Sequence, residues 1–225
     1  AAGRDVTVNF ATSNDTATAG SDYTATNGTL TISAGDTTGT IPITVLQDTV
    51  YERDETVTMT LSSASNATIS DATGTFTITD DESAPTVTLA TSASSIAENA
   101  GSSLTLTATL SGTTDANITV ALDTSGTATE GTDYTDGNGV VDDITISAGN
   151  TTGTVNFTPT DDSVYERDET AIISIDGVSG GDATESGTQS VTITITENES
   201  APTVTLTTSA TTIAENAGSS LTLTA

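Results

Sequence analysis

The chain lacks the residues on which most enzyme active sites and transition-metal centres depend. Its 225 residues include no Cys, His, Trp or Lys, and only three Arg. Zinc and copper sites use Cys and His ligands, so both metals are essentially excluded. Nucleophile–base pairs also draw on His, Cys or Lys, so we expect no enzyme activity. A carboxylate-pair glycosidase stays open, but repeats of the size described below offer no deep cleft.

Positive charge is almost absent as well. Thirty-one Asp and Glu residues against three Arg give a formal net charge of −28. A chain with no basic surface cannot release phosphate counterions, so nucleic acid is excluded as a partner, and anionic membrane surfaces are disfavoured. No run of 18 apolar residues occurs, so we expect no membrane insertion in this segment. Divalent cations or a salty medium are the natural partners.

Aromatic residues make up only 3% of the chain, so any core must be thin and aliphatic. Runs rich in Val, Ile and Thr alternate polar and apolar residues at a period of two, and no segment keeps a period of 3.6. In the first 80 residues we predict five strands: Asp5–Thr12, Gly28–Ile32, Gly39–Leu46, Glu55–Leu61 and Gly74–Thr79. Pro42 inside the third run favours an edge position. The pattern predicts an all-β fold of antiparallel β-sandwiches.

The sequence repeats itself with a period of about 115 residues. VYERDET occurs at 50–56 and 164–170, ESAPTVTL at 82–89 and 199–206, and IAENAGSSLTLTA at 96–108 and 213–225. Near-identity over such lengths indicates tandem duplication. We therefore predict a sandwich at 1–84 that lacks its first strands, a complete sandwich at 85–200, and the opening strands of a further repeat at 201–225.

Two interpretations of the last segment stay open. In the first, these residues are a window from a longer tandem array. In the second, segment 201–225 is a donor that completes the first domain of the next molecule by strand addition. Under either interpretation the partners are neighbouring repeats or copies of the chain, because an open half-sandwich presents an edge that promotes aggregation.

Acidic residues recur at matching positions of the two repeats. The strings DTVYERDE at 48–55 and DDSVYERDE at 161–169 carry the densest runs. Two carboxylates about 4 Å apart repel by roughly 4 kcal/mol at an effective dielectric near 20, so such a cluster requires a cation or raised pKa values. Calcium accepts six to eight oxygen ligands in irregular geometry and suits acidic loops. Solvated acidic loops and adaptation to salt are the alternatives. Recurrence of the acidic runs at matching positions argues against the first, and the second predicts acids scattered evenly over the surface.

The motifs together resemble the Calx-beta family. They are IAENAG at 96–101 and 213–218, DTATAGSDYT at 15–24 with GTATEGTDYT at 126–135, the VYERDE strings, and TITDDES and TITENES at the repeat ends. The resemblance covers the whole chain. It implies seven-stranded immunoglobulin-like sandwiches, joined end to end, that bind Ca²⁺ at one tip near the domain joint.

The resemblance also implies the ligands. For the first repeat they are Asp22, Asp48, Glu52, Glu55, Asp80 and Asp81 with the main-chain oxygen of Val50. For the second they are Glu98, Asp133, Asp161, Asp162, Glu166 and Glu169 with the main-chain oxygen of Val164; Glu197, Glu199 and Glu215 complete the candidates. Gln47 and Glu197–Asn198–Glu199 depart from the more acidic family pattern, so we expect fewer or weaker ions.

Other side chains receive structural roles. Tyr23 and Tyr134 follow the GSDYT and GTDYT aspartates, and we expect them to be core residues, with Tyr51 and Tyr165 as similar anchors. Arg53 and Arg167 are each flanked by acids, so we expect local surface ion pairs.

These observations lead to one functional hypothesis and weaker alternatives. We expect a calcium-binding structural repeat of an extracellular or cell-surface adhesin, matrix or filament protein, in which calcium stiffens the domain joints into a rod. A calcium-dependent carbohydrate- or ligand-binding module would need more exposed aromatic residues. A regulatory calcium sensor would share the site, but no effector region is visible.

Overall fold

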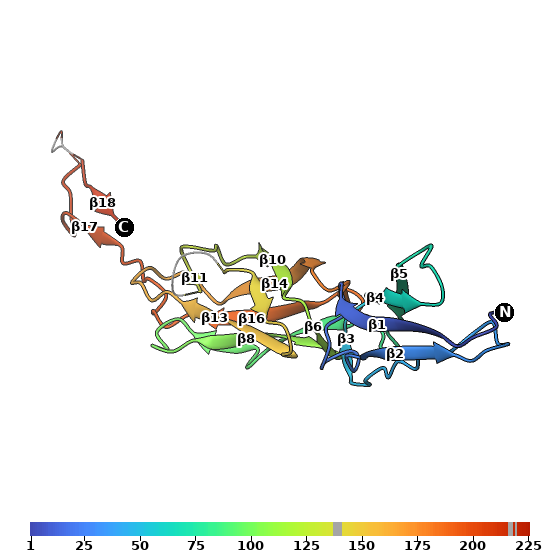
Figure 1. Cartoon of the computed structure of the whole chain (residues 1–225). Helices are drawn as coiled ribbons and strands as arrows, with labels where there is room; N and C mark the ends of the chain where they lie inside the picture. The colour runs from blue at the N-terminus through green and yellow to red at the C-terminus, as the bar shows by residue number, and fades with distance from the viewer. Residues whose placement is uncertain (137–140, 216–217, 219) are drawn as a thin grey trace.

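The computed structural model describes residues 1–136, 141–215, 218 and 220–225 as an elongated succession of β-strands, with no helix in that part of the chain. Figure 1 shows residues 1–84 at one end, residues 85–200 in the middle and a small hairpin at the other end. We call these the first unit, the second unit and the C-terminal hairpin. The prediction of an all-β, tandem sandwich fold is confirmed.

The second unit is a complete two-sheet sandwich. One sheet has the order β12-β10-β14-β16-β7, and the other has the order β11-β13-β8-β6-β15. The first consists of β12 (Ile144–Ile146), β10 (Ile118–Gly126), β14 (Glu169–Ser179), β16 (Ser190–Thr196) and β7 (Ser95–Ala97). The second consists of β11 (Tyr134–Thr135), β13 (Thr152–Pro159), β8 (Leu104–Leu110), β6 (Thr86–Thr91) and β15 (Thr184–Glu185).

The core of the second unit lies between these two sheets. Alternate residues of each strand point inward, as the period of two predicts. Val87, Leu106, Ile118, Ile173 and Ile193 are all fully buried. Tyr134 is buried too, and its ring stacks on Phe157 with centroids 4.6 Å apart. Its prediction as a core residue is confirmed, as is that of its counterpart Tyr23.

The first unit forms a single four-stranded sheet with the order β2-β1-β4-β5. These strands are β1 (Val6–Asn14), β2 (Asn27–Ile32), β4 (Glu55–Ser65) and β5 (Thr73–Ile78), in agreement with four of the five predicted runs. Its best-packed cluster contains only Ala17, Tyr23 and Val57 as buried residues. Val8 of β1 is buried as well, whereas Phe10, Met59 and Phe76 are only half-buried.

The predicted strand at Gly39–Leu46 is wrong, because that segment forms no strand and makes only an isolated bridge from Val45 to Tyr23. Its counterpart in the second unit is β13, which pairs with β8 over residues 152–157. The first unit has no strand in the place of β8. A backbone without a ladder partner does not become a regular strand, and Pro42 therefore lies outside any sheet instead of on an edge.

The C-terminal hairpin contains β17 (Thr207–Thr208) and β18 (Leu223–Thr224). They pair antiparallel, with Thr207 opposite Thr224 and Thr208 opposite Leu223. Two further short strands connect the units: β3 (Val50–Tyr51) of the first unit pairs in parallel with β9 (Thr113–Thr114) of the second.

Candidate metal centre

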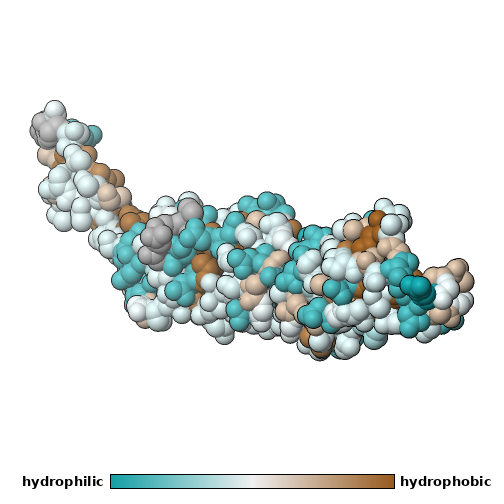
Figure 2. Space-filling model, viewed as in Figure 1, coloured by the Kyte–Doolittle hydropathy of each residue, from teal (hydrophilic) through white to brown (hydrophobic). Residues whose placement is uncertain are grey.

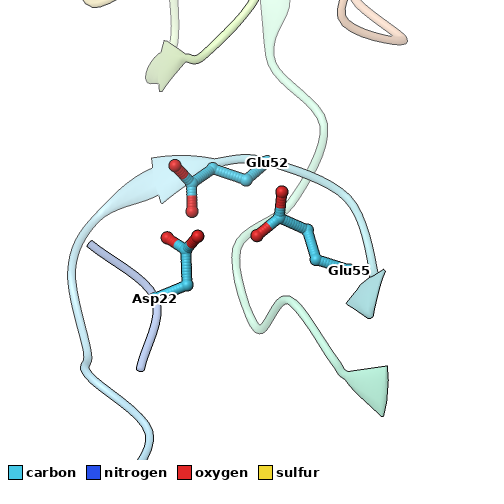
Figure 3. Close-up of side chains that lie close together, drawn as sticks. All are labelled: Asp22, Glu52 and Glu55. Atoms are coloured by element: carbon cyan, nitrogen blue, oxygen red, sulfur yellow. The ribbon is translucent and has the colours of Figure 1, made fainter. Parts of the chain in front are cut away.

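Three carboxylates of the first unit converge at its end nearest the second unit. Asp22 sits in a tight turn, where its backbone N–H donates to Thr18 O at 3.0 Å and its Oδ2 accepts from Thr18 N at 2.6 Å. Glu52 follows β3, and Glu55 begins β4. Oxygens of the three side chains lie within 4.8 Å of one another, and Figure 3 shows them pointing toward a common centre.

One oxygen of the Asp22 carboxylate is left for a cation to bind. Asp22 is only 7% exposed, yet its Oδ1 is buried and has no hydrogen-bond partner. A buried carboxylate oxygen without a partner is costly, and the cost is removed when a cation binds it. The donor set is oxygen alone, which fits a hard cation such as Ca²⁺.

The electrostatics of the cluster agree with this. Burial raises the pKa of Glu52 to about 7, and the charges of Asp22, Asp48 and Asp115 add to the shift. Burial also raises the pKa of Glu55 to about 7, and the nearby charges of Asp22 and Glu52 add to the shift. Both pKa values are raised because the ionised carboxylates repel one another and lose hydration. The two groups therefore resist full ionisation near neutral pH unless a cation is bound.

The second unit repeats the arrangement with Asp133, Glu166 and Glu169. Asp133 Oδ2 accepts from Thr129 N at 2.5 Å, which matches the turn around Asp22. Burial and the Asp133 charge raise the pKa of Glu169 to about 7. The same three positions therefore converge in both units, as the repeated acidic motifs predict.

The second unit also contains a further cluster of Glu98, Glu197 and Glu199. Glu98 and Glu197 line the same cleft as Asp133, Glu166 and Glu169. Glu197 accepts the backbone N–H groups of Glu166 and Glu199, which lowers its pKa to about 2. A hydrogen bond with Glu197, burial and nearby charges raise the pKa of Glu199 to about 7. Glu197 thus closes the loop that carries Glu166 as well as adding negative charge to the cleft.

The remaining candidates lie around these clusters. Asp48, Asp80 and Asp81 line one cleft together with Asp22, Glu52 and Glu55. Asp48 and Asp162 each accept a hydrogen bond from the N–H two residues on, that of Val50 at 2.8 Å and that of Val164 at 2.6 Å. Glu98 Oε1 accepts from Asp162 N, and the Asp161 charge contributes to the raised pKa of Glu98. Glu215 lies exposed on the C-terminal segment, in none of the three clusters. The roles of the Val50 and Val164 oxygens stay predictions.

Gln47, where the resemblance implies an aspartate, makes a hydrogen bond to a candidate ligand. Its Nε2 donates to Asp81 Oδ1 at 2.6 Å. The neutral amide therefore stabilises the Asp81 carboxylate and occupies one oxygen of this candidate ligand. The expectation of fewer or weaker ions stays a prediction.

The loop that carries Glu52 also forms the joint between the two units. Val50 and Tyr51 pair with Thr113 and Thr114, and Asp115 N donates to Tyr51 O at 3.3 Å. Within this loop, residues that face the candidate ion thus lie next to residues that contact the second unit.

A salt bridge reinforces this joint. Arg53 Nε and Nη2 lie 2.5 and 2.7 Å from the two carboxylate oxygens of Asp182, and Tyr51 OH donates to the same residue at 3.0 Å. These hydrogen bonds hold the pKa of Asp182 below its usual range. Arg53 has a positive φ of 72°, a backbone conformation that non-glycine residues adopt uncommonly.

Two sequence-based interpretations are wrong. Arg53 makes a surface ion pair, but its partner is in the next unit, 129 residues away, and the pair is not local. Tyr51 and Tyr165 are not core anchors: Tyr51 reaches across the joint, and Tyr165 is 37% exposed. Asp115 and Asp182 were missed altogether, because neither belongs to a repeated motif.

Comparisons with known proteins identify the family. The Calx-beta domain model matches residues 1–82 and again residues 80–200. No curated protein matches the chain significantly. Among the residues that the structure describes, no helix could span a membrane.

Three solved structures are similar. The crystal structure of CBD12 from CALX1.2 shares 18% identity, covers 88% of this chain and 89% of its own, and has a TM-score of 0.39. The apo form of the Calx CBD1 domain shares 30% identity over 35% of this chain and 71% of its own, with a TM-score of 0.32. The calcium-binding domain CBD12 of CALX1.1 shares 21% identity, covers 78% and 69%, and has a TM-score of 0.34.

Calx-beta domains are calcium-binding domains, and the family matches both units of this structure in sequence. The chain therefore belongs to the Calx-beta family, as two tandem domains.

Proposed function

We propose that this chain is a calcium-binding structural repeat of an extracellular or cell-surface adhesin, matrix or filament protein, and that calcium stiffens the joint between its domains. The observation that carries the proposal is the dual role of residues 48–55. That loop supplies Glu52 and Glu55 to the acidic cluster and Val50, Tyr51 and Arg53 to the contact with the next unit.

The ion would act by removing repulsion at the joint. Without a cation, the acids of the first unit face one another and also the charge of Asp115 from the second unit, which contributes to the raised pKa values of Glu52 and Glu55. A bound divalent cation neutralises this charge and fixes the loop conformation. The loop in turn presents β3 and Arg53 to the second unit. Calcium at a hundredfold excess over its dissociation constant would also stabilise the folded state by about 2.7 kcal/mol.

A non-catalytic role agrees with the side chains available. The clefts of both units are lined mainly by carboxylates, with Arg53 or Arg167 at one side. Such a set can bind and release a hard cation, and binding would change the stiffness of the joint. Stiff domains in tandem would extend a long chain away from a cell surface.

The joint contact can be tested with one substitution and distance measurements. Ser33→Cys and Ser147→Cys place spin labels at equivalent exposed positions of the two units, and the chain has no native Cys. Arg53→Ala removes the cross-unit salt bridge, so we expect a broader label-to-label distance distribution in calcium-free buffer. In the labelled chain that keeps Arg53, calcium should narrow the distribution of label-to-label distances.

Arg167→Ala is the matched control. Arg167 occupies the equivalent position with a φ of 82°, and its side chain makes no salt bridge among the described residues. We expect the distances in this variant to equal those of the parent. Distributions that are the same for Arg53→Ala and Arg167→Ala, or that calcium leaves unchanged, would contradict the stiffening mechanism.

A further inference from the structure

The joint between the two units brings a carboxylate of the second unit beside the acidic cluster of the first. β3 and β9 pair in parallel, and their last pair is Tyr51 with Thr114. Glu52 and Asp115 come next in the same register, and Asp115 N donates to Tyr51 O at 3.3 Å. Neighbouring strands lie about 4.8 Å apart, so the side chains of Glu52 and Asp115 start from adjacent backbone positions.

The charge of Asp115 acts on the cluster itself. It contributes to the raised pKa of Glu52 and to that of Glu55, the two candidate ligands that residues 48–55 supply. Among the largest contributors to these two shifts, only Asp115 belongs to the second unit. Asp115 is also exposed, so its side chain can turn toward an ion without disturbing the core.

An independent feature marks the cluster as a cation site. Asp22 is 7% exposed, and its buried Oδ1 has no hydrogen-bond partner. It lines the same cleft as Glu52 and Glu55. A buried carboxylate oxygen without a partner is costly until a cation binds it. Calcium takes six to eight oxygen ligands in irregular geometry, so a carboxylate that lies beside Glu52 is a suitable further ligand.

We propose that Asp115 binds the ion of the first unit, so that one calcium site is built from both units. The proposal rests on the calcium function stated above and extends it. The ion would remove repulsion at the joint and would also hold the two units together through a shared set of ligands. Separation of the units would take a ligand away from the ion, so calcium binding and docking of the units would strengthen each other.

The second unit provides an internal reference. Its equivalent loop is residues 161–169, in which residues 164–165 pair with no strand among the residues that the structure describes. Tyr165 is exposed, and Figure 2 shows hydrophilic surface at this end of the unit, beside the C-terminal hairpin. The Asp133 cluster takes all its carboxylates from one unit, so its calcium affinity should not depend on Asp115.

NMR titration of calcium into the full chain tests the proposal, because it follows the two sites separately. Gly20 and Gly131 begin the repeated GSDYT and GTDYT turns, and each N–H donates to the carbonyl oxygen three residues on, at 2.9 and 2.8 Å. Their amide signals report on the first and the second site. Asp115→Asn exchanges a charged ligand for a neutral oxygen at an exposed edge of the site, so affinity at Gly20 should fall about tenfold. Affinity at Gly131 should stay unchanged.

Two further variants separate the ligand from general charge. Asp176→Asn removes the same charge from an exposed position on β14 and should leave both affinities unchanged. Asp115→Glu keeps a carboxylate and should retain most of the affinity at Gly20. Asp115→Asn itself preserves the joint, because it keeps the N–H that donates to Tyr51 and an oxygen that can accept from Thr114 Oγ1.

The outcomes distinguish the shared ligand from the calcium function. If calcium shifts both glycine signals but Asp115→Asn weakens binding at Gly20 no more than Asp176→Asn does, the shared ligand is wrong and the calcium function stands. Equal weakening at Gly20 and Gly131 would also overturn it, because Asp115 would then act only through the net charge. If calcium shifts neither signal in the parent chain, the calcium function is wrong and the shared ligand falls with it.

Discussion

Asp133→Asn is expected to weaken calcium binding to the second unit at least about a hundredfold, or about 3 kcal/mol. Asp133 lies in the cluster with Glu166 and Glu169. The substitution replaces its carboxylate by an amide, so the ion loses a charged ligand and keeps only a neutral oxygen. The substitution preserves the turn, because the Asn side-chain oxygen can still accept from Thr129 N. Lost affinity would then report on the ion and not on the fold.

Calorimetric titration of calcium into the variant measures this effect. Asp123→Asn is the control, since it removes the same charge from an exposed position on β10 outside the clusters. Its affinity should stay within a few-fold of the parent chain. Equal weakening by both substitutions would mean that calcium responds only to the net charge, and the site assignment would then be wrong.

The calcium-free protein should melt at a higher temperature at pH 5.5 than at pH 7.5. Glu52, Glu55, Glu169 and Glu199 each have a pKa raised from 4.5 to about 7. Between these values the folded state binds more protons than the unfolded state, so the free energy of unfolding falls as pH rises through this window. Above about pH 7 the folded groups are ionised too, and the dependence should level off.

Saturating calcium should abolish or reverse this order of melting temperatures, because the ion binds the ionised carboxylates. The measurement is thermal unfolding by circular dichroism at both pH values, with chelator and with calcium. Glu169→Gln should reduce the pH dependence of the chelated protein, whereas Asp123→Asn should preserve it. A calcium-free protein that is more stable at pH 7.5 would show that the pKa values of these carboxylates are not raised in the folded state.

The repeated motifs made much of this structure predictable. The period-two runs located β1, β2, β4 and β5 closely, and the paired DYT and YERDE strings indicated the acids that meet at Asp22 and Asp133. These features follow from local patterns, which the sequence displays directly. The Tyr23 and Tyr134 core positions followed from the same motifs.

The features that escaped prediction depend on contacts between distant segments. The run at 39–46 has a strand pattern, but a strand needs a neighbour, and that neighbour is missing in the first unit. The joint depends on Asp115 and Asp182, which lie outside every repeated string. Arg53 was misassigned because its nearest acids in sequence are not its partner in space.

The central claim is that the chain binds calcium through its clustered carboxylates, and calorimetric titration of the 225-residue chain tests it most directly. We predict saturable heat from at least two ions per chain, one for the Asp22 cluster and one for the Asp133 cluster, at a sodium chloride concentration that screens non-specific attraction. No heat beyond dilution at millimolar calcium would contradict the account, because the buried, unpaired oxygen of Asp22 would then have no cation to satisfy it.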